Sequence, residues 1–347
     1  GKTHTVEFAY GGLGVNNHWG TPRNPWDDSE HRVSGGSSSG AGVSLIEGSA
    51  HLALGSDTAG SVRIPASFTG NVGLKITHGR WPLDGITPLG PSLDTPGVLA
   101  RSVADAALGF AALDPATDPG ALMAAIEDAG LAGLRMGICD DTFWRDCSPG
   151  VAEGVKAALD EAVAAGARLL PFELPEGEEV YRLFRRGGIV AAEFYAFLVE
   201  HLPDWIETLD PVVTARFENA REMPAYEYVN RRELVDRCSG AADERLRAVD
   251  VVVMPTVAIT PTRLAEVSAV EGYKEANLMA LRNTSTGNML TLCGLTIPVA
   301  LDAAGMPVGL QLLARRDHEH RLLAIGRAFE KRLGTARERL GVAPLCR

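Results

Sequence analysis

The sequence has few cysteines and no long apolar run. Its five cysteines are an odd number and form no CxxC pair, so neither a disulfide framework nor a zinc ribbon is indicated, and reduced thiols in a cytoplasmic protein are expected. No run approaches the roughly 18 to 20 apolar residues of a transmembrane helix. The hydrophobic fraction of 46% and the charged fraction of 22% over 347 residues are typical of a globular protein with a large core.

Positive charge is also scarce. Lys and Arg number 33 against 44 Asp and Glu, which gives a formal net charge of −11. An acidic chain without a basic block repels phosphate groups, so we expect neither nucleic acid nor a membrane as a partner. None of the eight histidines lies in a motif for a catalytic base, and no HExxH or clustered carboxylate pattern is present. We therefore expect no metal and no cofactor.

Three regions of the chain differ in composition and hydrophobic pattern. Residues 1–110 are rich in Gly, Ser, Thr and Pro, which is typical of tight loops that join buried strands and short helices. Residues from about 115 to 245 are helical in pattern, and we expect a helical variable insertion within a single domain, 1–347. Further on, buried strands return, with a hairpin predicted over 297–301 and 308–313. Strands that alternate with helices predict an α/β fold, a layered sheet covered on both faces.

Two glycine-rich loops hold serines where the backbone can turn sharply, GGSSSG at 35–40 and GSDTAGSVRIPA at 55–66. The run from Thr58 to Ser61 offers consecutive backbone N–H groups with little side-chain bulk, and such a nest can hold an oxyanion. A serine at its end can act as the nucleophile that those amides serve. Glycine–serine loops alone are more often linkers or phosphate cradles, but no GxxxxGK[ST] or GxSxG pattern supports those alternatives.

The paired loops, with Ser37 and Ser61 24 positions apart, resemble the amidase signature family. The resemblance extends to both ends of the chain and is thinner across its helical middle. Its further segments are GKT at 1–3, EFA at 7–9, NPW at 24–26, the blocks at 70–80 and 88–105, and Asn288 with the segment 305–311. The resemblance implies an α/β/α layered fold with a large mixed β-sheet covered by helices on both faces.

The resemblance also implies a Ser-Ser-Lys triad. By position, Ser61 is the nucleophile that forms an acyl-enzyme, and Ser37 is the bridging serine, preceded by a cis Gly36–Ser37 peptide. Further residues carried over by position are Thr58, Ala59, Gly60 and Ser61 for the oxyanion hole, Ala9 and Tyr10 for the substrate side, and Ser38 in a supporting place. Ala59 departs from the family's usual glycine, and its methyl narrows the pocket beside the nucleophile.

The family's catalytic lysine belongs several dozen residues before Ser37, where this sequence has 36 residues. We therefore expect the chain to be N-terminally incomplete and the base to lie upstream. Lys2 and Lys75 match other family lysines, outside the triad.

Asp57 and Arg63 flank the nucleophile and allow two interpretations, a part of the site or a buried ion pair that holds the loop. The second is favoured, because a buried charge needs such a partner. Ile64, Phe68 and Leu89 suggest an apolar wall of the pocket.

The function that follows is hydrolysis of a small-molecule carboxylic amide to an acid plus ammonia or an amine. One alternative is the glutaminase (A) subunit of a tRNA-dependent amidotransferase, although Ile64 stands where that protein typically has glutamine. Another is a non-catalytic member of the family that binds amides or a partner. The sequence leaves a homodimer open.

Overall fold

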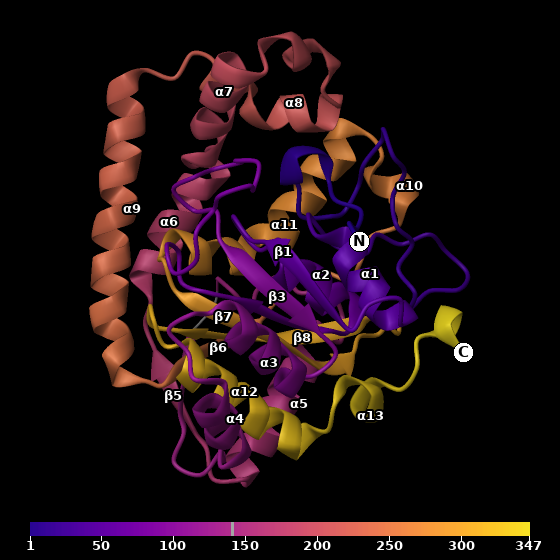
Figure 1. The fold of residues 1–347 in the computed structure, drawn as a ribbon, viewed down its shortest axis with the longest axis vertical. Helices are drawn as coiled ribbons and strands as arrows, with labels where there is room; N and C mark the ends of the chain where they lie inside the picture. The colour runs from indigo at the N-terminus through magenta and orange to yellow at the C-terminus, as the bar shows by residue number, and fades with distance from the viewer. Residues whose placement is uncertain (140–141) are drawn as a thin grey trace.

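The computed structural model describes residues 1–139 and 142–347. Its centre is an eight-stranded mixed sheet in the order β1-β3-β2-β7-β8-β6-β4-β5 (Figure 1). The strands are β1 (Leu52–Ser56), β2 (Val72–Lys75), β3 (Pro96–Ala100), β4 (Arg135–Cys139), β5 (Arg168–Phe172), β6 (Val251–Pro255), β7 (Cys293–Leu301) and β8 (Pro307–Ala314). β4 runs parallel to β5 and β6, and the other pairs are antiparallel.

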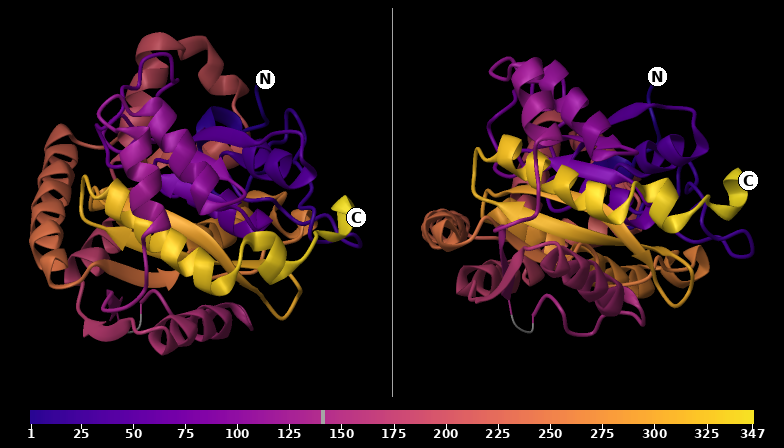
Figure 2. Two further views of the ribbon diagram at one scale, coloured as in Figure 1. Left: turned by 60° about the horizontal axis from the view of Figure 1, so that its bottom comes forward. Right: turned by 90° about the horizontal axis from the view of Figure 1, so that it is seen from below.

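The central strands are apolar on both faces, as β6 illustrates. Val251 and Val253 belong to a core cluster on one face of the sheet, and Val252 and Met254 belong to another cluster on the opposite face. Because side chains alternate along a strand, an uninterrupted apolar run fits a strand that is covered on both sides. The two views in Figure 2 show helices above and below the sheet, which confirms the predicted layered α/β fold.

The helices divide between these two faces. One face is covered by α3 (Val103–Leu113), α4 (Pro119–Glu127), α5 (Val151–Ala164) and α12 (Glu319–Leu333). The other is covered by α1 (Ser39–Glu47), α2 (Arg63–Thr69), α6 (Pro175–Arg185) and α11 (Val270–Met289). The remaining helices are α7 (Val190–His201), α8 (Pro211–Phe217), α9 (Ala225–Arg245), α10 (Leu264–Val267) and α13 (Ala336–Leu340). The site lies on the second face, where the glycine-rich loops meet α11.

The predicted C-terminal hairpin is present and longer than expected. β7 and β8 pair antiparallel from Cys293 with Ala314 to Leu301 with Pro307. The register shifts between Pro298 and Ala300, which fits a proline that cannot donate to the ladder.

The middle of the chain contributes strands as well as helices. β4 and β5 form one edge of the sheet, and α6 to α9 follow them. The 21-residue α9 stands on the outside and packs on α6 (Figure 1). Within residues 1–139 and 142–347, no helix combines the length and the apolar character needed to cross a membrane.

Candidate active site

The two serine loops lie against each other on the α1–α2 side of the sheet. Ser61 follows β1 and precedes α2, and Ser37 precedes α1. The Gly36–Ser37 peptide is cis, as the resemblance implied. The amide of Ser38 donates to the carbonyl of Ser61 at 3.3 Å, so a direct hydrogen bond joins the bridging-serine loop to the nucleophile loop.

The backbone amides of the nucleophile loop fall into two groups. The amide of Asp57 donates to the Thr95 carbonyl at 2.7 Å, and the amides of Val62 and Arg63 donate to the Asp57 carboxylate at 3.1 and 3.4 Å. The four amides between them, 58–61, have no hydrogen-bond partner within the described part of the chain. Since buried amides are nearly always paired, four consecutive free donors beside a serine are suited to an oxyanion.

A fully buried ion pair lies directly beneath this loop. Nε and Nη2 of Arg63 donate hydrogen bonds to the Asp57 carboxylate at 3.1 and 2.9 Å, and both side chains are 0% exposed. Arg63 also donates to Gln311 at 2.7 Å and to Asn288 at 2.5 Å, and Asn288 donates back to the Asp57 carbonyl. Burial opposes ionisation of Asp57, but the charge of Arg63 holds its pKa below the usual value. This geometry is the loop-holding ion pair favoured by the sequence.

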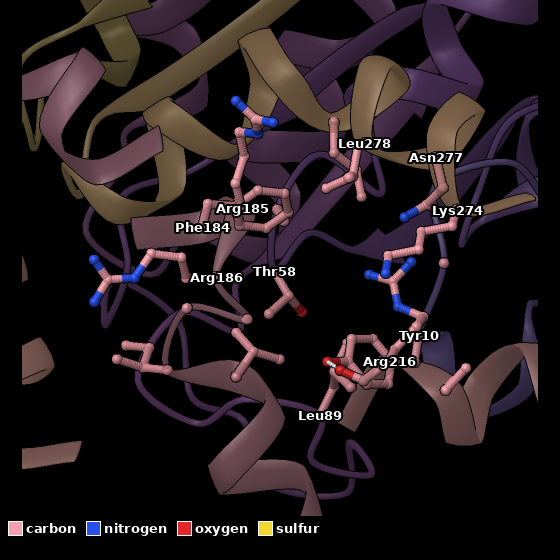
Figure 3. A pocket seen from close by; sticks show the side chains of 18 of the residues that line it. Tyr10, Thr58, Leu89, Phe184, Arg185, Arg186, Arg216, Lys274, Asn277 and Leu278 are labelled. Atoms are coloured by element: carbon pink, nitrogen blue, oxygen red, sulfur yellow. Dashed lines mark hydrogen bonds between the residues drawn. The ribbon is translucent and has the colours of Figure 1, made fainter. Parts of the chain in front are cut away.

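A pocket of about 480 Å³ opens beside Ser61, a size that suits a small organic molecule. Five of the predicted site residues line it, namely Ala9, Tyr10, Thr58, Ala59 and Ser61. Figure 3 shows Thr58 and Tyr10 facing the cavity. The other five predicted site residues are buried and do not line the pocket, namely Ser37, Ser38, Gly60, Asp57 and Arg63.

The apolar wall of the pocket differs from the expectation. Leu89 lines it as predicted, but Ile64 and Phe68 do not, because they point into a core cluster and are 0% and 1% exposed. The short α2 presents these two side chains to the interior. Leu278 and Leu281 of α11 and Val190 of α7 line the cavity in their place.

The pocket is basic, although the chain as a whole is acidic. Its lining includes Arg185, Arg186, Arg216, Arg231 and Lys274, and no Asp or Glu occurs among the described residues that line it. Arg231 and Arg186 pair with Glu227, whereas the described part of the chain gives Arg185, Arg216 and Lys274 no ion-pair partner. Low-dielectric walls strengthen such a field, so the cavity attracts anions.

Arg216 is the pocket cation that lies against Tyr10. Its guanidinium stacks over the Tyr10 ring at 4.3 Å (Figure 3). The side chain is partly buried, and neither its Nε and Nη1 nor the buried hydroxyl of Tyr273 makes a well-formed hydrogen bond within the described chain. Burial raises the pKa of Tyr10 and of Tyr273, and the charge of Arg216 and its closeness to both hydroxyls oppose the shifts. A guanidinium and a hydroxyl on one side of a pocket can bind a carboxylate together.

Lys75 lies outside this pocket, as expected. It is fully buried and donates to the carbonyls of Ile76 and Leu292, at 2.8 Å each. Burial and the nearby Arg63 lower its pKa to about 8. No hydrogen bond joins Ser37 or Ser61 to a lysine or histidine of the described residues, nor does that part of the chain hold a group of three or more His, Cys, Asp or Glu suited to a metal.

Sequence reasoning missed the cationic side of the pocket. Arg216 comes from α8, and Tyr273, Lys274 and Asn277 come from one face of α11. The spacing from 273 to 277 places these side chains on one helix face. Nothing local in the sequence shows that this face meets Tyr10, more than 260 residues earlier.

Comparison with known proteins places this geometry in context. The model of the Amidase family matches residues 1–323. The 2-amino-5-chloromuconic acid deaminase of Comamonas testosteroni is 51% identical over 345 residues, which are 99% of this chain and 74% of that protein. The (A) subunit of the glutamyl-tRNA(Gln) amidotransferase of Cupriavidus necator is 32% identical, over 95% of this chain and 74% of its own length. The crystal structure of an amidase superposes with a TM-score of 0.82 at 30% identity, over 96% of this chain and 74% of that one.

Proposed function

The chain belongs to the Amidase family, and we propose that it hydrolyses the C–N bond of a small carboxylate-bearing substrate with Ser61 as the nucleophile. The observation that supports this substrate class most directly is Arg216, a partly buried guanidinium without a carboxylate partner in the described chain, in the pocket that Ser61 lines. A bound carboxylate would supply that partner.

The proposed chemistry on an amide has two steps. Ser61 Oγ loses its proton towards Ser37 and attacks the carbonyl carbon, and the oxygen that becomes negative binds the free amides of 58–61. The C–N bond then breaks, the nitrogen leaves as ammonia or an amine after it gains the proton, and an acyl-enzyme remains. Water cleaves the ester and releases the acid. We propose the lysine of a Ser-Ser-Lys triad as the base that exchanges the proton with Ser37.

The relatives help to choose among substrates. The protein at 51% identity is a deaminase for an amino dicarboxylic acid, and the amidotransferase protein is more distant at 32%. A pocket with three unpaired cations and no carboxylate among its described lining fits an acid with one or more carboxylates better than it fits a neutral amide. We therefore propose carboxylate-bearing amides of this size as substrates of the two-step chemistry. We also propose 2-amino-5-chloromuconic acid, whose C–N bond breaks when water adds to C2 of the imine tautomer and ammonia leaves, so that a 2-oxo acid forms.

Labelling and ammonia release test the nucleophile. A fluorophosphonate probe on the full-length protein should modify the peptide that contains Ser61, and Ser61→Ala should abolish both labelling and ammonia release. Labelling of another serine that Ser61→Ala leaves unchanged would remove Ser61 from this role.

The substrate class is tested by removal of the Arg216 charge. Arg216→Met keeps much of the apolar contact with Tyr10 but loses the charge, so KM for 2-amino-5-chloromuconic acid should rise about 10- to 100-fold, as one charge-assisted contact predicts. The matched control is Arg221→Met, because Arg221 also stacks on aromatic rings, those of Tyr195 and Phe217, but does not line the pocket. Equal KM values for the two variants would contradict carboxylate binding by Arg216.

A further inference from the structure

The peptide between Ala59 and Gly60 is held by a residue from the other end of the chain. Thr284 on α11 donates its hydroxyl to the Ala59 carbonyl at 2.7 Å, across a separation of 225 residues. The same hydroxyl lies 3.4 Å from the Leu281 carbonyl in its own helix, a longer and weaker contact. Thr284 is 0% exposed, so its hydroxyl is shielded from water.

This hydrogen bond sets the direction of an oxyanion donor. The Ala59–Gly60 peptide is trans and planar, so its N–H points opposite to its C=O. The carbonyl is directed at α11, and the Gly60 N–H is therefore directed away from α11. It is one of the four amides without a partner in the described chain.

Thr284 also fixes where this peptide lies. Gly60 has φ of +139°, which favours glycine. A Cβ at Gly60 would lie 2.2 Å from the Thr284 Oγ and 2.6 Å from the Thr284 Cβ, so the two residues are in direct contact. The loop can neither approach α11 further nor carry a side chain at this point.

The neighbouring polar residues of α11 are engaged elsewhere. Asn288 binds Asp57, and Asn283 donates to the carbonyls of Phe143 and Pro255. The hydroxyl of Thr286 is buried and has no hydrogen-bond partner among the described residues. We propose that Thr284 is a positioning residue, which orients the Gly60 amide towards the oxygen that becomes negative in the reaction. This inference rests on the proposed function of the 58–61 amides.

A residue that orients an oxyanion donor stabilises the transition state more than it stabilises the bound substrate, so its loss should lower kcat more than it changes KM. Loss of a whole oxyanion-hole donor typically costs about 10²- to 10³-fold in kcat, and a donor that is retained but free to turn should cost less. We expect Thr284→Val to lower kcat about tenfold or more with KM within about twofold, since the carboxylate contact at Arg216 is unchanged.

The experiment compares Thr284→Val, Thr284→Ser and Thr286→Val in the full-length protein. Each is measured by the rate constant of Ser61 labelling with a fluorophosphonate probe, and by kcat and KM with a carboxylate-bearing amide, succinamic acid. Thr284→Val should slow labelling about tenfold, Thr284→Ser should restore it because the hydroxyl returns, and Thr286→Val should match the wild type because it removes a hydroxyl without a partner in the described chain. If valine impairs folding, Thr284→Ala replaces it, since alanine also lacks the hydroxyl and cannot crowd Gly60.

The outcomes separate the two proposals. Wild-type protein that is not labelled at Ser61 contradicts the proposed nucleophile. Wild-type protein that is labelled at Ser61, with equal rates for Thr284→Val and Thr286→Val, overturns the positioning role alone. Slow labelling of both Thr284→Val and Thr284→Ser would also overturn it, because the effect would then not depend on the hydroxyl.

Discussion

Removal of Arg63 should destabilise the protein strongly. Arg63→Met replaces the guanidinium by a shorter, apolar side chain and leaves the Asp57 carboxylate in a site that is 0% exposed. Asp57 retains hydrogen bonds from Asn288 and from the Val62 amide, but it loses both guanidinium bonds and the adjacent charge. When one partner of a buried ion pair is removed, the loss is about 3–5 kcal/mol, because an uncompensated charge remains.

This free energy translates into a measurable change in melting temperature. Unfolding entropy is about 2.1 cal/mol/K per residue, or about 0.7 kcal/mol/K for a domain of this length, so 3–5 kcal/mol corresponds to a fall of about 4–7 °C. Calorimetry or circular dichroism on the full-length protein measures the shift. The control is Arg247→Met, because Arg247 and Glu244 form an exposed pair with side chains 60% and 72% accessible, which should contribute under about 0.5 kcal/mol.

The pH dependence provides a second test of the same reasoning. In the wild type the pKa of Asp57 is lowered, so its stabilising contribution is present above the unfolded pKa and is lost as the pH falls through the folded pKa. In Arg63→Met the pKa of Asp57 should rise, and protonation then relieves the unpaired charge. The deficit of the variant should therefore narrow at acidic pH. A deficit below about 1 kcal/mol, or one independent of pH, would refute a stabilising ion pair.

Three further outcomes are expected. Ser37→Ala should reduce kcat about 10²- to 10⁴-fold while the melting temperature changes little, because a proton relay is lost; an undiminished kcat would remove Ser37 from the mechanism. The free energy of unfolding of the wild type, relative to that of Lys75→Met, should rise between pH 8 and 10.5. In that window Lys75 is protonated in the unfolded chain but largely neutral in the folded protein, because its folded pKa is lowered to about 8. Urea titrations that give the same difference at every pH would contradict this. Chelation by EDTA should leave ammonia release unchanged, and a loss that one specific ion restores would count against a serine mechanism.

Parts of the site that depend on short sequence spacing were predictable. Asp57 and Arg63 are six positions apart around one turn, and the loop of 58–61 is continuous in sequence, so small residues and consecutive amides are visible without a structure. The fold class followed from strand–helix alternation, and the hairpin of β7 and β8 followed from two apolar runs around a turn. The catalytic roles of Ser37 and Ser61 stay predictions.

Parts that depend on distant contacts were not predictable in the same way. Asn288 and Gln311, which complete the environment of Arg63, are separated from it by 225 and 248 residues. Ile64 and Phe68 are apolar and near Ser61 in sequence, which suggests a pocket wall, but the short α2 turns both into the core. Apolar character alone does not distinguish a pocket wall from a buried helix face.

The pocket and the chain as a whole differ in the sign of their charge. A net charge of −11 describes the field of the whole chain at a distance, and it argues against binding to a polyanion. A small anion inside the cavity responds instead to the nearest groups, because the surrounding protein has a low dielectric constant and screening ions are excluded. Arg216 lies there without a carboxylate partner in the described chain, and Arg185 and Lys274 are exposed at the same pocket. A negative net charge and a basic cavity are therefore compatible, and the proposed choice of a carboxylate substrate rests on the cavity.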